Sequence, residues 1–269
     1  MTSQLPPVLL VGCGRMGSAM LSGWRRRGLT PSVAVDPAPQ AARHAGPDLR
    51  VVGSETEIPA GFTPEAVVLA VKPQNAAETL PDYAGYAGLS VFLSIMAGRT
   101  IGGIQAALGS DAAIVRAMPN TPAAIHQAIT VACASPAVSK AQRGLCTDLL
   151  SAIGAVEWVE DESLLDPVTA VSGSGPAYVF LLAELLEQAA RDQGIPADLA
   201  RVLARRTVAG SGALLAASEE DAAALRQAVT SPGGTTAAAL QVLMADEAWP
   251  AAMRGAIAAA TRRSRELAG

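Results

Sequence analysis

Short apolar runs recur through the first half of the chain, separated by turns and by segments with helical spacing. The first run, Val8–Gly12, is followed by a predicted helix over about Arg15–Arg27. Continuous apolar runs of this length are typical of strands that a parallel sheet buries on both faces. The pattern predicts an α/β, doubly wound, Rossmann-type domain over residues 1–160. The other predicted strands are Ser32–Asp36, Ala66–Val71, Ser90–Ile95, Ala112–Met118 and Ala128–Ala134.

The pattern changes from about Ser163, where β-branched runs disappear and alanine and leucine recur with a helical period. Pro176–Gly194 begins with proline and ends with glycine, the usual punctuation of a helix, and Pro196–Ser218 begins in the same way. These segments predict an all-helical domain over residues 161–269. Because an alanine-rich helical domain of only about 105 residues has a thin core, we expect it to form a homodimer.

Charge and composition argue against several kinds of partner. The net charge is −4 with lysine and arginine scattered, so neither nucleic acid nor a membrane is indicated as a partner. The first residues carry no basic segment, and the apolar run after them is too short for a signal peptide or a membrane span. Cys13, Cys133 and Cys146 lie far apart and show no metal-ligand spacing. We expect reduced thiols, no metal site and a cytoplasmic protein.

The stretch "GCGRMG" follows the first predicted strand and opens the first predicted helix. Gly12 permits a tight turn, Gly14 lets the backbone approach a pyrophosphate, and Gly17 lets helix and strand pack closely. The N–H groups at the helix start, around Arg15 and Met16, would then face the phosphates. A glycine-rich turn with a purely structural role is the alternative, but the strand and helix that the dinucleotide motif requires are both present.

Asp36 ends the next predicted strand, about 20 residues beyond this motif, where a carboxylate can hold an adenosine ribose 2′-hydroxyl. Its charge would repel a 2′-phosphate. Arg43 and the turn Pro37–Gln40 offer a way to accommodate that phosphate, and Asp36 as an ordinary turn residue is the alternative. The sequence therefore predicts NADPH or NADH as cofactor and leans toward NADH.

Three further loops are expected at the carboxyl edge of the sheet, where open α/β folds bind ligands. "AVKPQ" follows Ala66–Val71, "IMAGRT" follows Ser90–Ile95, and "AMPNTP" leaves the strand that ends at Met118. Lys72 is placed to contact the ribose or nicotinamide, with a solvated lysine as the alternative. Asn120, between two prolines, is placed to reach the pocket shared by nicotinamide and substrate.

The residue types that the helical domain lacks restrict which substrate group can accept the hydride. Lysine occurs only at Lys72 and Lys140, and histidine only at His44 and His126, where both are expected at the surface. The helical domain thus offers neither type as the acid or base that a carbonyl or alcohol substrate needs. A protonated imine accepts hydride without a protein acid, provided that the site positions it and excludes water. This absence favours an imine substrate.

Two motifs of the helical domain fit such a substrate. In "AVSGSGPAY", Ser172 can bond to a substrate nitrogen, and a helix kink with locally satisfied serines is the alternative. "SPGGTT" joins glycine N–H groups to threonines at a helix start, a combination typical of an anion nest that holds a carboxylate without arginine. A plain turn between helices is the alternative. The nest residues are Ser231, Gly233, Gly234, Thr235 and Thr236.

Six stretches together resemble the pyrroline-5-carboxylate reductase family, in the family's order and across essentially the whole chain. They are "GCGRMGSAM", "AVKPQ", "SIMAGRT", "RAMPNTP", "AVSGSGPAY" and "AVTSPGGTT". The resemblance implies reduction of 1-pyrroline-5-carboxylate to L-proline, the last step of proline biosynthesis, with NADPH or NADH. It also implies a helical dimerisation domain after the Rossmann domain, and dimers that often assemble further, commonly into decamers.

The resemblance also implies roles for individual residues in binding the substrate. It places the substrate carboxylate on Ser231, Gly234 and Thr236. Ser172 matches a position near the imine nitrogen where the family often has threonine, and either residue supplies a hydroxyl.

The cofactor side carries one departure from the family. "VDPAP" stands where many NADPH-using members have Asn, Ser or Arg, which puts a preference for NADPH in doubt. Asn120, Lys72 and Ala97 match family positions near the nicotinamide. The remaining predicted cofactor-binding residues are Gly12, Gly14, Arg15, Met16, Gly17, Asp36, Ala70, Val71, Pro73 and Gly98.

Two other classes of protein fit parts of this pattern. A β-hydroxyacid dehydrogenase of similar architecture requires a lysine in the helix after a glycine-rich turn, and the helix after "SGSGPAY" has none. A non-catalytic dinucleotide-binding regulator would need neither an anion nest nor a hydroxyl at the nicotinamide.

Overall fold

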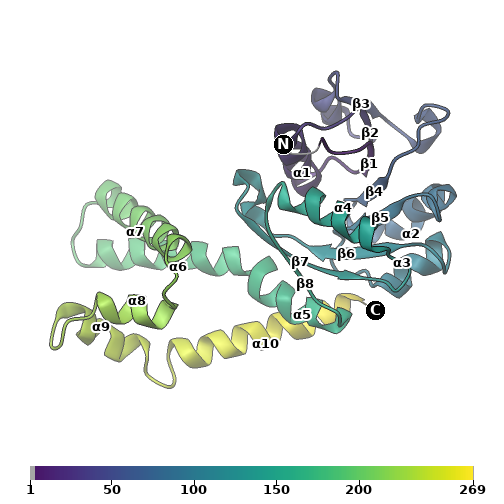
Figure 1. Cartoon of the computed structure of the whole chain (residues 1–269). Helices are drawn as coiled ribbons and strands as arrows, with labels where there is room; N and C mark the ends of the chain where they lie inside the picture. Colours follow the sequence, from purple (N-terminus) through teal and green to yellow (C-terminus); the bar gives the residue numbers. More distant parts are fainter. Residues whose placement is uncertain (1–3, 269) are drawn as a thin grey trace. The chain divides into compact units, whose positions relative to one another are not determined.

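An eight-stranded sheet forms the framework of the first half of the chain in the computed structural model, which describes residues 4–268 (Figure 1). The strand order is β3-β2-β1-β4-β5-β6-β7-β8, and all neighbours are parallel except β6 and β7. The order reverses between β1 and β4, which is where open α/β sheets bind ligands. The strands are β1 (Val8–Val11), β2 (Ser32–Val35), β3 (Leu49–Val52), β4 (Ala66–Leu69), β5 (Val91–Ser94), β6 (Ile114–Met118), β7 (Ala128–Ala134) and β8 (Gly154–Trp158).

The six predicted strands are all present, and two further strands, β3 and β8, complete the sheet. β8 alternates between half-buried and exposed positions, and β3 carries the exposed Arg50. Both lie at the ends of the sheet, so neither forms the continuous apolar run that marks a central strand. Edge strands with mixed sides are therefore the part of the sheet that the hydrophobic pattern does not reveal.

Two apolar clusters lie on opposite faces of the sheet. Successive strand residues alternate between them: Leu10 joins the cluster that contains Trp24 of α1 and Leu149 of α4, whereas Leu9 joins the cluster that contains Ile104 of α3. The sheet is thus covered on both faces, which confirms the predicted doubly wound α/β class. The helices over the sheet are α1 (Arg15–Arg27), α2 (Ala76–Thr79), α3 (Ile101–Leu108) and α4 (Lys140–Ser151).

The rest of the described chain is helical and begins with a segment that changes its winding. α5 (Leu165–Val168) continues into a π-helical turn, Thr169–Gly173, and then into α6 (Gly175–Asp192). π turns are rare and occur often at functional sites, and this one contains Ser172. The remaining helices are α7 (Ala197–Ala217), α8 (Ala222–Ala228), α9 (Thr235–Leu243) and α10 (Trp249–Ala268).

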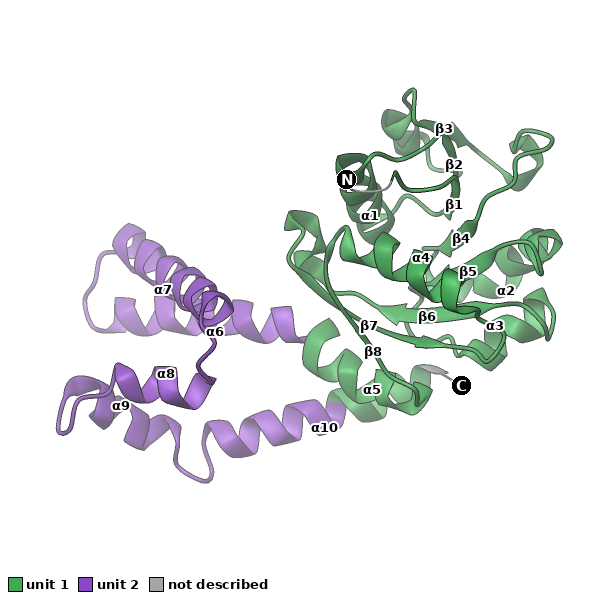
Figure 2. Cartoon of the chain, in the orientation of Figure 1, with its two compact units in different colours: residues 1–173, 260–269 green, residues 174–259 purple. Residues whose placement is uncertain are grey.

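The chain divides into two compact units (Figure 2). Unit 1 comprises residues 1–173 and 260–269, and unit 2 comprises residues 174–259. The division differs from the predicted boundary at Glu160 because α5 and the π turn pack with the sheet, as Leu165 does in its second cluster. The end of α10 also belongs to unit 1, a return that no local pattern in the sequence indicates.

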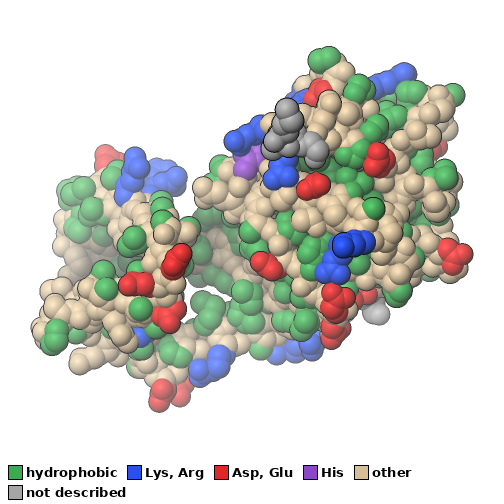
Figure 3. Space-filling view, in the orientation of Figure 1, with side chains coloured by type: hydrophobic (Ala, Val, Ile, Leu, Met, Phe, Trp, Pro, Cys, Tyr) green, Lys and Arg blue, Asp and Glu red, His purple; other side chains and the backbone are tan. Residues whose placement is uncertain are grey.

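Unit 2 has almost no interior of its own. Along α6, α7, α8 and α9 only Ala200 and Ala204 are buried, and hydrophobic side chains lie on its visible surface (Figure 3). The helical stretch Glu162–Asp192 is also long and apolar enough to cross a membrane, judged by length and composition alone. Exposed apolar side chains of this kind are also expected on helices that pack against another subunit. The exposed large apolar residues of α6 are Val179, Phe180, Leu181, Leu185 and Leu186.

Candidate active site

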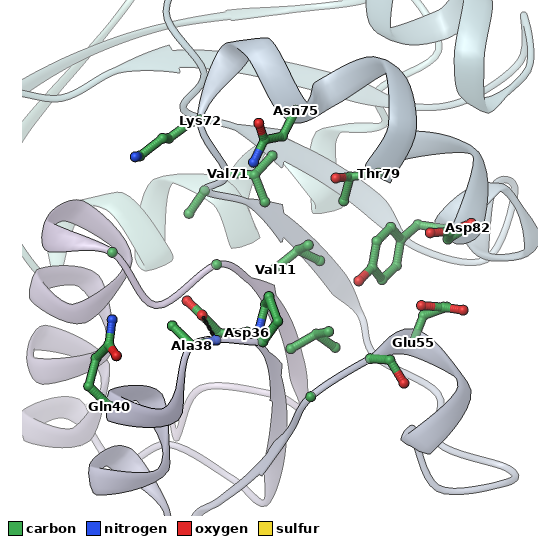
Figure 4. A pocket seen from close by; sticks show the side chains of 18 residues that line it. Val11, Asp36, Ala38, Gln40, Glu55, Val71, Lys72, Asn75, Thr79 and Asp82 are labelled. Atoms are coloured by element: carbon green, nitrogen blue, oxygen red, sulfur yellow. Dashed lines mark hydrogen bonds between the residues drawn. The ribbon is translucent and has the colours of Figure 1, made fainter.

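A cavity of about 520 Å³ opens at the carboxyl ends of β1, β2 and β4 (Figure 4). Its size falls within the range of about 300–1,000 Å³ that is usual for small-molecule sites, and it lies at the reversal of strand order. Of the predicted cofactor residues, those that line it are Gly12, Gly14, Asp36, Ala70, Val71 and Lys72.

Three glycines of the first loop are required for three different reasons. Gly12 has φ +100°, and a Cβ there would lie 2.7 Å from the carbonyl oxygen of Ala70. A Cβ on Gly17 would collide with the carbonyl oxygen of Gly12. Gly14 has neither constraint, since its φ is −63° and a Cβ would meet no atom within 4 Å. Open space in front of a glycine is what close approach of a ligand to the backbone needs, so the loop fits a pyrophosphate.

The N-terminus of α1 adds donors beside this open space. The first intrahelical bond runs from the N–H of Ser18 to the carbonyl of Gly14, at 2.9 Å. The N–H groups of Arg15, Met16 and Gly17 therefore have no carbonyl partner within the helix. Such groups, together with the positive end of the helix dipole, form an anion site.

The carboxylate of Asp36 is held by two backbone N–H groups. Oδ2 accepts from Cys13 at 2.6 Å and Oδ1 accepts from Ala38 at 2.9 Å. Each oxygen retains a lone pair for a ribose hydroxyl. Two more carboxylates, Glu55 and Asp82, line the same cavity, whereas its only lining lysine or arginine is Lys72 (Figure 4).

The Cys13 thiol beside Asp36 is protonated at neutral pH. Burial, and secondarily the charge of Asp36, raise its pKa to about 11. A thiol with so high a pKa carries little of the thiolate form that acts as nucleophile.

His44 is not the plain surface residue that the sequence suggests. Its Nε2 lies 3.1 Å from Oγ of Ser18, which donates to the carbonyl of Cys13 at 2.7 Å. The same Nε2 also accepts a hydrogen bond from Nε of Arg43 at 3.3 Å. Burial and then the charges of Arg43 and Arg25 lower the pKa of His44, against a smaller opposite effect of Asp36.

The loop after β4 and the loop after β5 are joined by Arg99. Its Nε and Nη2 both donate to the carbonyl of Pro73, at 3.0 and 2.7 Å. Ala97 is exposed, whereas Gly98 is buried with φ +68°. Pro73, Ala97 and Gly98 lie outside the lining of the cavity.

Asn120 connects the end of β6 to the π turn. Its Nδ2 donates to the carbonyl of Ser172 at 3.1 Å, and its Oδ1 accepts the N–H of Ile129 at 3.1 Å. Because the side chain is 8% exposed and its oxygen is occupied, its visible role is to hold the backbone of Ser172. The hydroxyl of Ser172 donates to the carbonyl of Val168 at 3.0 Å, which leaves its oxygen as an acceptor.

The "SPGGTT" loop lies in unit 2 and leads into α9. Gly233 has φ +69°, and the N–H of Gly234 is already donated to the carbonyl of Ser231 at 3.1 Å. The first intrahelical bond of α9 is from Ala238 to Gly234, so the N–H groups of Thr235 and Thr236 have no helical partner. Within residues 4–268, the hydroxyls of Ser231, Thr235 and Thr236 make no hydrogen bond. The loop thus presents unpaired donors without a charge.

Several residues that line the cavity were not predicted from the sequence. Glu55 follows β3, an edge strand that the apolar pattern does not reveal, and Tyr83 lies in an irregular helical segment after α2. A polar residue just after a strand on the ligand side of the sheet is the signal that would have identified Glu55. Asn75, Thr79 and Asp82 are further polar lining residues that no motif indicated, whereas Gln40 belongs to the turn Pro37–Gln40 considered above for a 2′-phosphate.

Comparison with known proteins decides the family. A family model described as pyrroline-5-carboxylate reductase dimerisation matches residues 162–267, and one described as NADP oxidoreductase, coenzyme F420-dependent, matches residues 7–98. The chain is 38% identical to the pyrroline-5-carboxylate reductase of Pseudomonas aeruginosa over 268 residues, which is 98% of this chain and 97% of that protein. The chain belongs to the pyrroline-5-carboxylate reductase family.

Solved structures of pyrroline-5-carboxylate reductases agree in fold over the whole length. The enzyme of Coxiella burnetii superposes with a TM-score of 0.90 at 30% identity, with 100% of each chain covered. The enzyme of Plasmodium falciparum with NADP bound gives 0.84 at 27% identity, with 99% of each chain covered. The present protein is thus an NAD(P)H-dependent oxidoreductase that reduces 1-pyrroline-5-carboxylate to proline. Its dimerisation domain makes it a homo-oligomer.

Proposed function

We propose how the residues of this reductase divide the reduction of 1-pyrroline-5-carboxylate between them. The predicted Rossmann-type domain, residues 1–160, binds the dinucleotide. The predicted helical domain, residues 161–269, binds the substrate. The observation that carries the first half is the open space before Gly14 next to the anchored carboxylate of Asp36. The pyrophosphate contacts Gly12, Gly14 and the start of α1, and the nicotinamide end contacts Lys72 and Ala97.

We propose that the reductase uses NADH in preference to NADPH. Asp36 holds the ribose hydroxyls, and Glu55 and Asp82 add negative charge to the same cavity. A 2′-phosphate there would face three carboxylates against one lysine. Like charges placed together cost several kcal/mol, which supports NADH.

We propose that "SPGGTT" binds the substrate carboxylate. The support is its set of unpaired donors: the N–H groups of Thr235 and Thr236 and the hydroxyls of Ser231, Thr235 and Thr236. Gly233 supplies the left-handed turn, and Gly234 leaves room for Ser231, since a Cβ on Gly234 would lie 2.6 Å from the Ser231 Oγ. Neutral donors at a helix start bind an anion without a counter-charge.

We propose that Ser172 accepts a hydrogen bond from the N–H of the protonated imine. Its own hydrogen is committed to the carbonyl of Val168, so its oxygen is suited to a cationic donor. Asn120 fixes the backbone at this position. When bound, the dinucleotide supplies the hydride that adds to the imine carbon, and the nitrogen keeps its proton as the amine of proline forms.

We propose that the homo-oligomer is built on a dimer through the helical domain, with further assembly into a decamer, in the cytoplasm. The exposed apolar residues of α6 and α7 support the dimer contact. The family resemblance supports the larger assembly.

The test follows the loss of reduced-nicotinamide absorbance with either cofactor and with two ring substrates. One is 1-pyrroline-5-carboxylate, and the other is 1-pyrroline, which lacks the carboxylate. We expect turnover of the first and a much higher KM for the second. Thr236→Val should raise the KM for 1-pyrroline-5-carboxylate about tenfold, because it removes a hydroxyl donor to a charged group, and should leave the KM for 1-pyrroline unchanged.

Thr230→Val is the matched control, since the Thr230 hydroxyl donates to the carbonyl of Arg226 at 2.7 Å and lies outside the nest. Equal loss with both substrates in Thr236→Val would show that the loop is structural. No loss of absorbance with either cofactor would refute the enzymatic assignment.

A further inference from the structure

The last turn of α10 belongs to unit 1, although the helix begins in unit 2. α10 runs from Trp249 to Ala268, and its residues from 260 onward pack with the nucleotide-binding unit (Figure 2). No part of the function proposed above uses this turn. Two contacts show what it touches.

The first contact is between the turn and the loop after β5. Gly98 is buried, its φ is +68°, and a Cβ added there would lie 2.7 Å from the carbonyl oxygen of Leu267. The backbone of the last turn therefore lies directly on the backbone of the loop. Only glycine both adopts this φ without strain and leaves room for that carbonyl.

The second contact holds the turn in place. Oγ of Ser264 donates to Oδ1 of Asp166 at 2.7 Å, and Ser264 is 8% exposed. The guanidinium of Arg265 lies 4.0 Å from the other oxygen of Asp166. A hydrogen bond to a partly buried carboxylate is stronger than one between neutral groups, so it is the main polar tie of this turn.

These contacts join two elements that have a proposed role in the reaction: the segment that leads from α5 to Ser172, and the loop after β5. Asp166 lies in α5, two residues before Val168, whose carbonyl accepts the hydroxyl of Ser172. The loop after β5 contains Ala97, and the helix after it donates the N–H of Ile101 to Glu162, just before α5. The last turn of α10 therefore closes a ring of contacts between the loop and the segment that carries Ser172.

We propose that the last turn of α10, anchored by Ser264 on Asp166, holds loop 95–100 in the conformation that binds the nicotinamide end of the cofactor. The inference rests on the proposed function in one respect, the assignment of Ala97 and Gly98 to the cofactor site. Ser264 and Asp166 act as positioning residues, because neither contacts a reacting atom. Loosening them lowers the fraction of the protein that is competent to bind cofactor.

The experiment compares four full-length variants: Ser264→Ala, Asp166→Ala, the double variant and Arg263→Ala. Arg263 is the matched control, since it pairs with Glu266 at 2.8 Å on the same turn but is exposed and does not touch Asp166. The measurements are KM for NADH and NADPH, kcat at saturating cofactor, and hydrogen exchange of the amides of residues 95–101. Two single variants from opposite sides of the contact keep the test valid if one of them fails to fold.

We expect the KM for the cofactor to rise about three- to tenfold in Ser264→Ala and Asp166→Ala, because apparent affinity falls with the competent fraction. The KM of the double variant should be no higher than that of the single variants, since the two residues form one interaction. At saturating cofactor, kcat should stay within about twofold, because bound cofactor restores the loop. Exchange of residues 95–101 should become faster, and Arg263→Ala should match the wild type in every measurement.

Three results would overturn the inference, and the first two separate its failure from that of the site assignment. Unchanged exchange and unchanged KM would mean that the turn does not hold the loop, and the proposed function would stand. Faster exchange with unchanged KM would mean that the loop does not bind cofactor, so the assignment of Ala97 and Gly98 would fall with the inference. A loss of kcat without a change in KM would also contradict a positioning role in cofactor binding.

Discussion

At the scale of single residues, Asp36 combines a structural task with the proposed selection of the cofactor. Its carboxylate accepts the N–H groups of Cys13 and Ala38, so it shapes the glycine-rich loop before any ligand binds. Asp36 and Glu55 line the same cavity, in which the proposed binding mode would place a 2′-phosphate. A substitution therefore affects affinity for both cofactors, and only the ratio between them reports on selection.

We expect the wild-type protein to show a higher kcat/KM with NADH than with NADPH. Asp36→Ser should lower that ratio about tenfold or more, because a repulsion of several kcal/mol is removed, and should raise KM for both cofactors because the loop loses two acceptors. Initial rates with each cofactor measure this. Glu57→Gln is the control, since Glu57 lies nearby but outside the cavity lining. A wild-type preference for NADPH would contradict the prediction.

At the scale of elements, the segment from Glu162 to Gly173 is tied to the sheet at both ends. At one end Oε1 of Glu162 accepts from Arg116 of β6 at 2.8 Å and from the N–H of Ile101 at 2.8 Å. At the other end Asn120 holds the carbonyl of Ser172. The Arg116 side chain is 3% exposed, and its Nε and Nη2 have no partner within residues 4–268. Among the described residues, Glu162 is thus the carboxylate that forms an ion pair with this buried guanidinium.

We expect Glu162→Gln to lower the free energy of unfolding by about 2–4 kcal/mol, because removing one partner of a buried pair leaves the other charge uncompensated. Urea unfolding measures this. Glu160→Gln is the matched control: Glu160 is 87% exposed and lies 3.2 Å from Arg143, so its loss should not change the unfolding midpoint. Equal midpoints for both variants and the wild type would show that the buried pair contributes nothing.

At the scale of the whole molecule, the two units differ in how they are stabilised. Unit 1 has a sheet with apolar clusters on both faces, whereas the described helices α6 to α9 bury only two alanines. A helical unit without an interior cannot offset its conformational entropy alone. The family model for dimerisation covers these helices, and the dimer proposed above would supply the missing contacts.

We expect Leu185→Glu on α6 to convert the assembly to smaller species and to abolish the dependence of Tm on protein concentration, because it places a charge on an apolar contact surface. Leu185 is 56% exposed. Leu89→Glu is the control, because Leu89 is 74% exposed but lies in unit 1. Sedimentation and thermal unfolding at several concentrations measure both variants. An unchanged sedimentation coefficient for Leu185→Glu would place the subunit contact elsewhere.

The local pattern of the sequence determined the fold class, and six short motifs carried the resemblance to the family of this protein. Buried strands between helices, the glycine motif after the first strand and the "SPGGTT" break within helices depend on residues that are neighbours in the chain, so periodicity and turn chemistry reveal them. Both the α/β class and the family are confirmed. The individual site roles stay predictions.

Tertiary structure decided which side chains meet. Asn120 bonds to Ser172, Arg99 to Pro73 and Leu267 packs on Gly98, and each pair is separated by dozens of residues in the chain or more. The same is true of the two added edge strands and of the return of α10 to unit 1. Such contacts depend on how packed elements bring distant backbone groups together, and the geometry of a buried hydrogen bond is set by that packing and not by local preference.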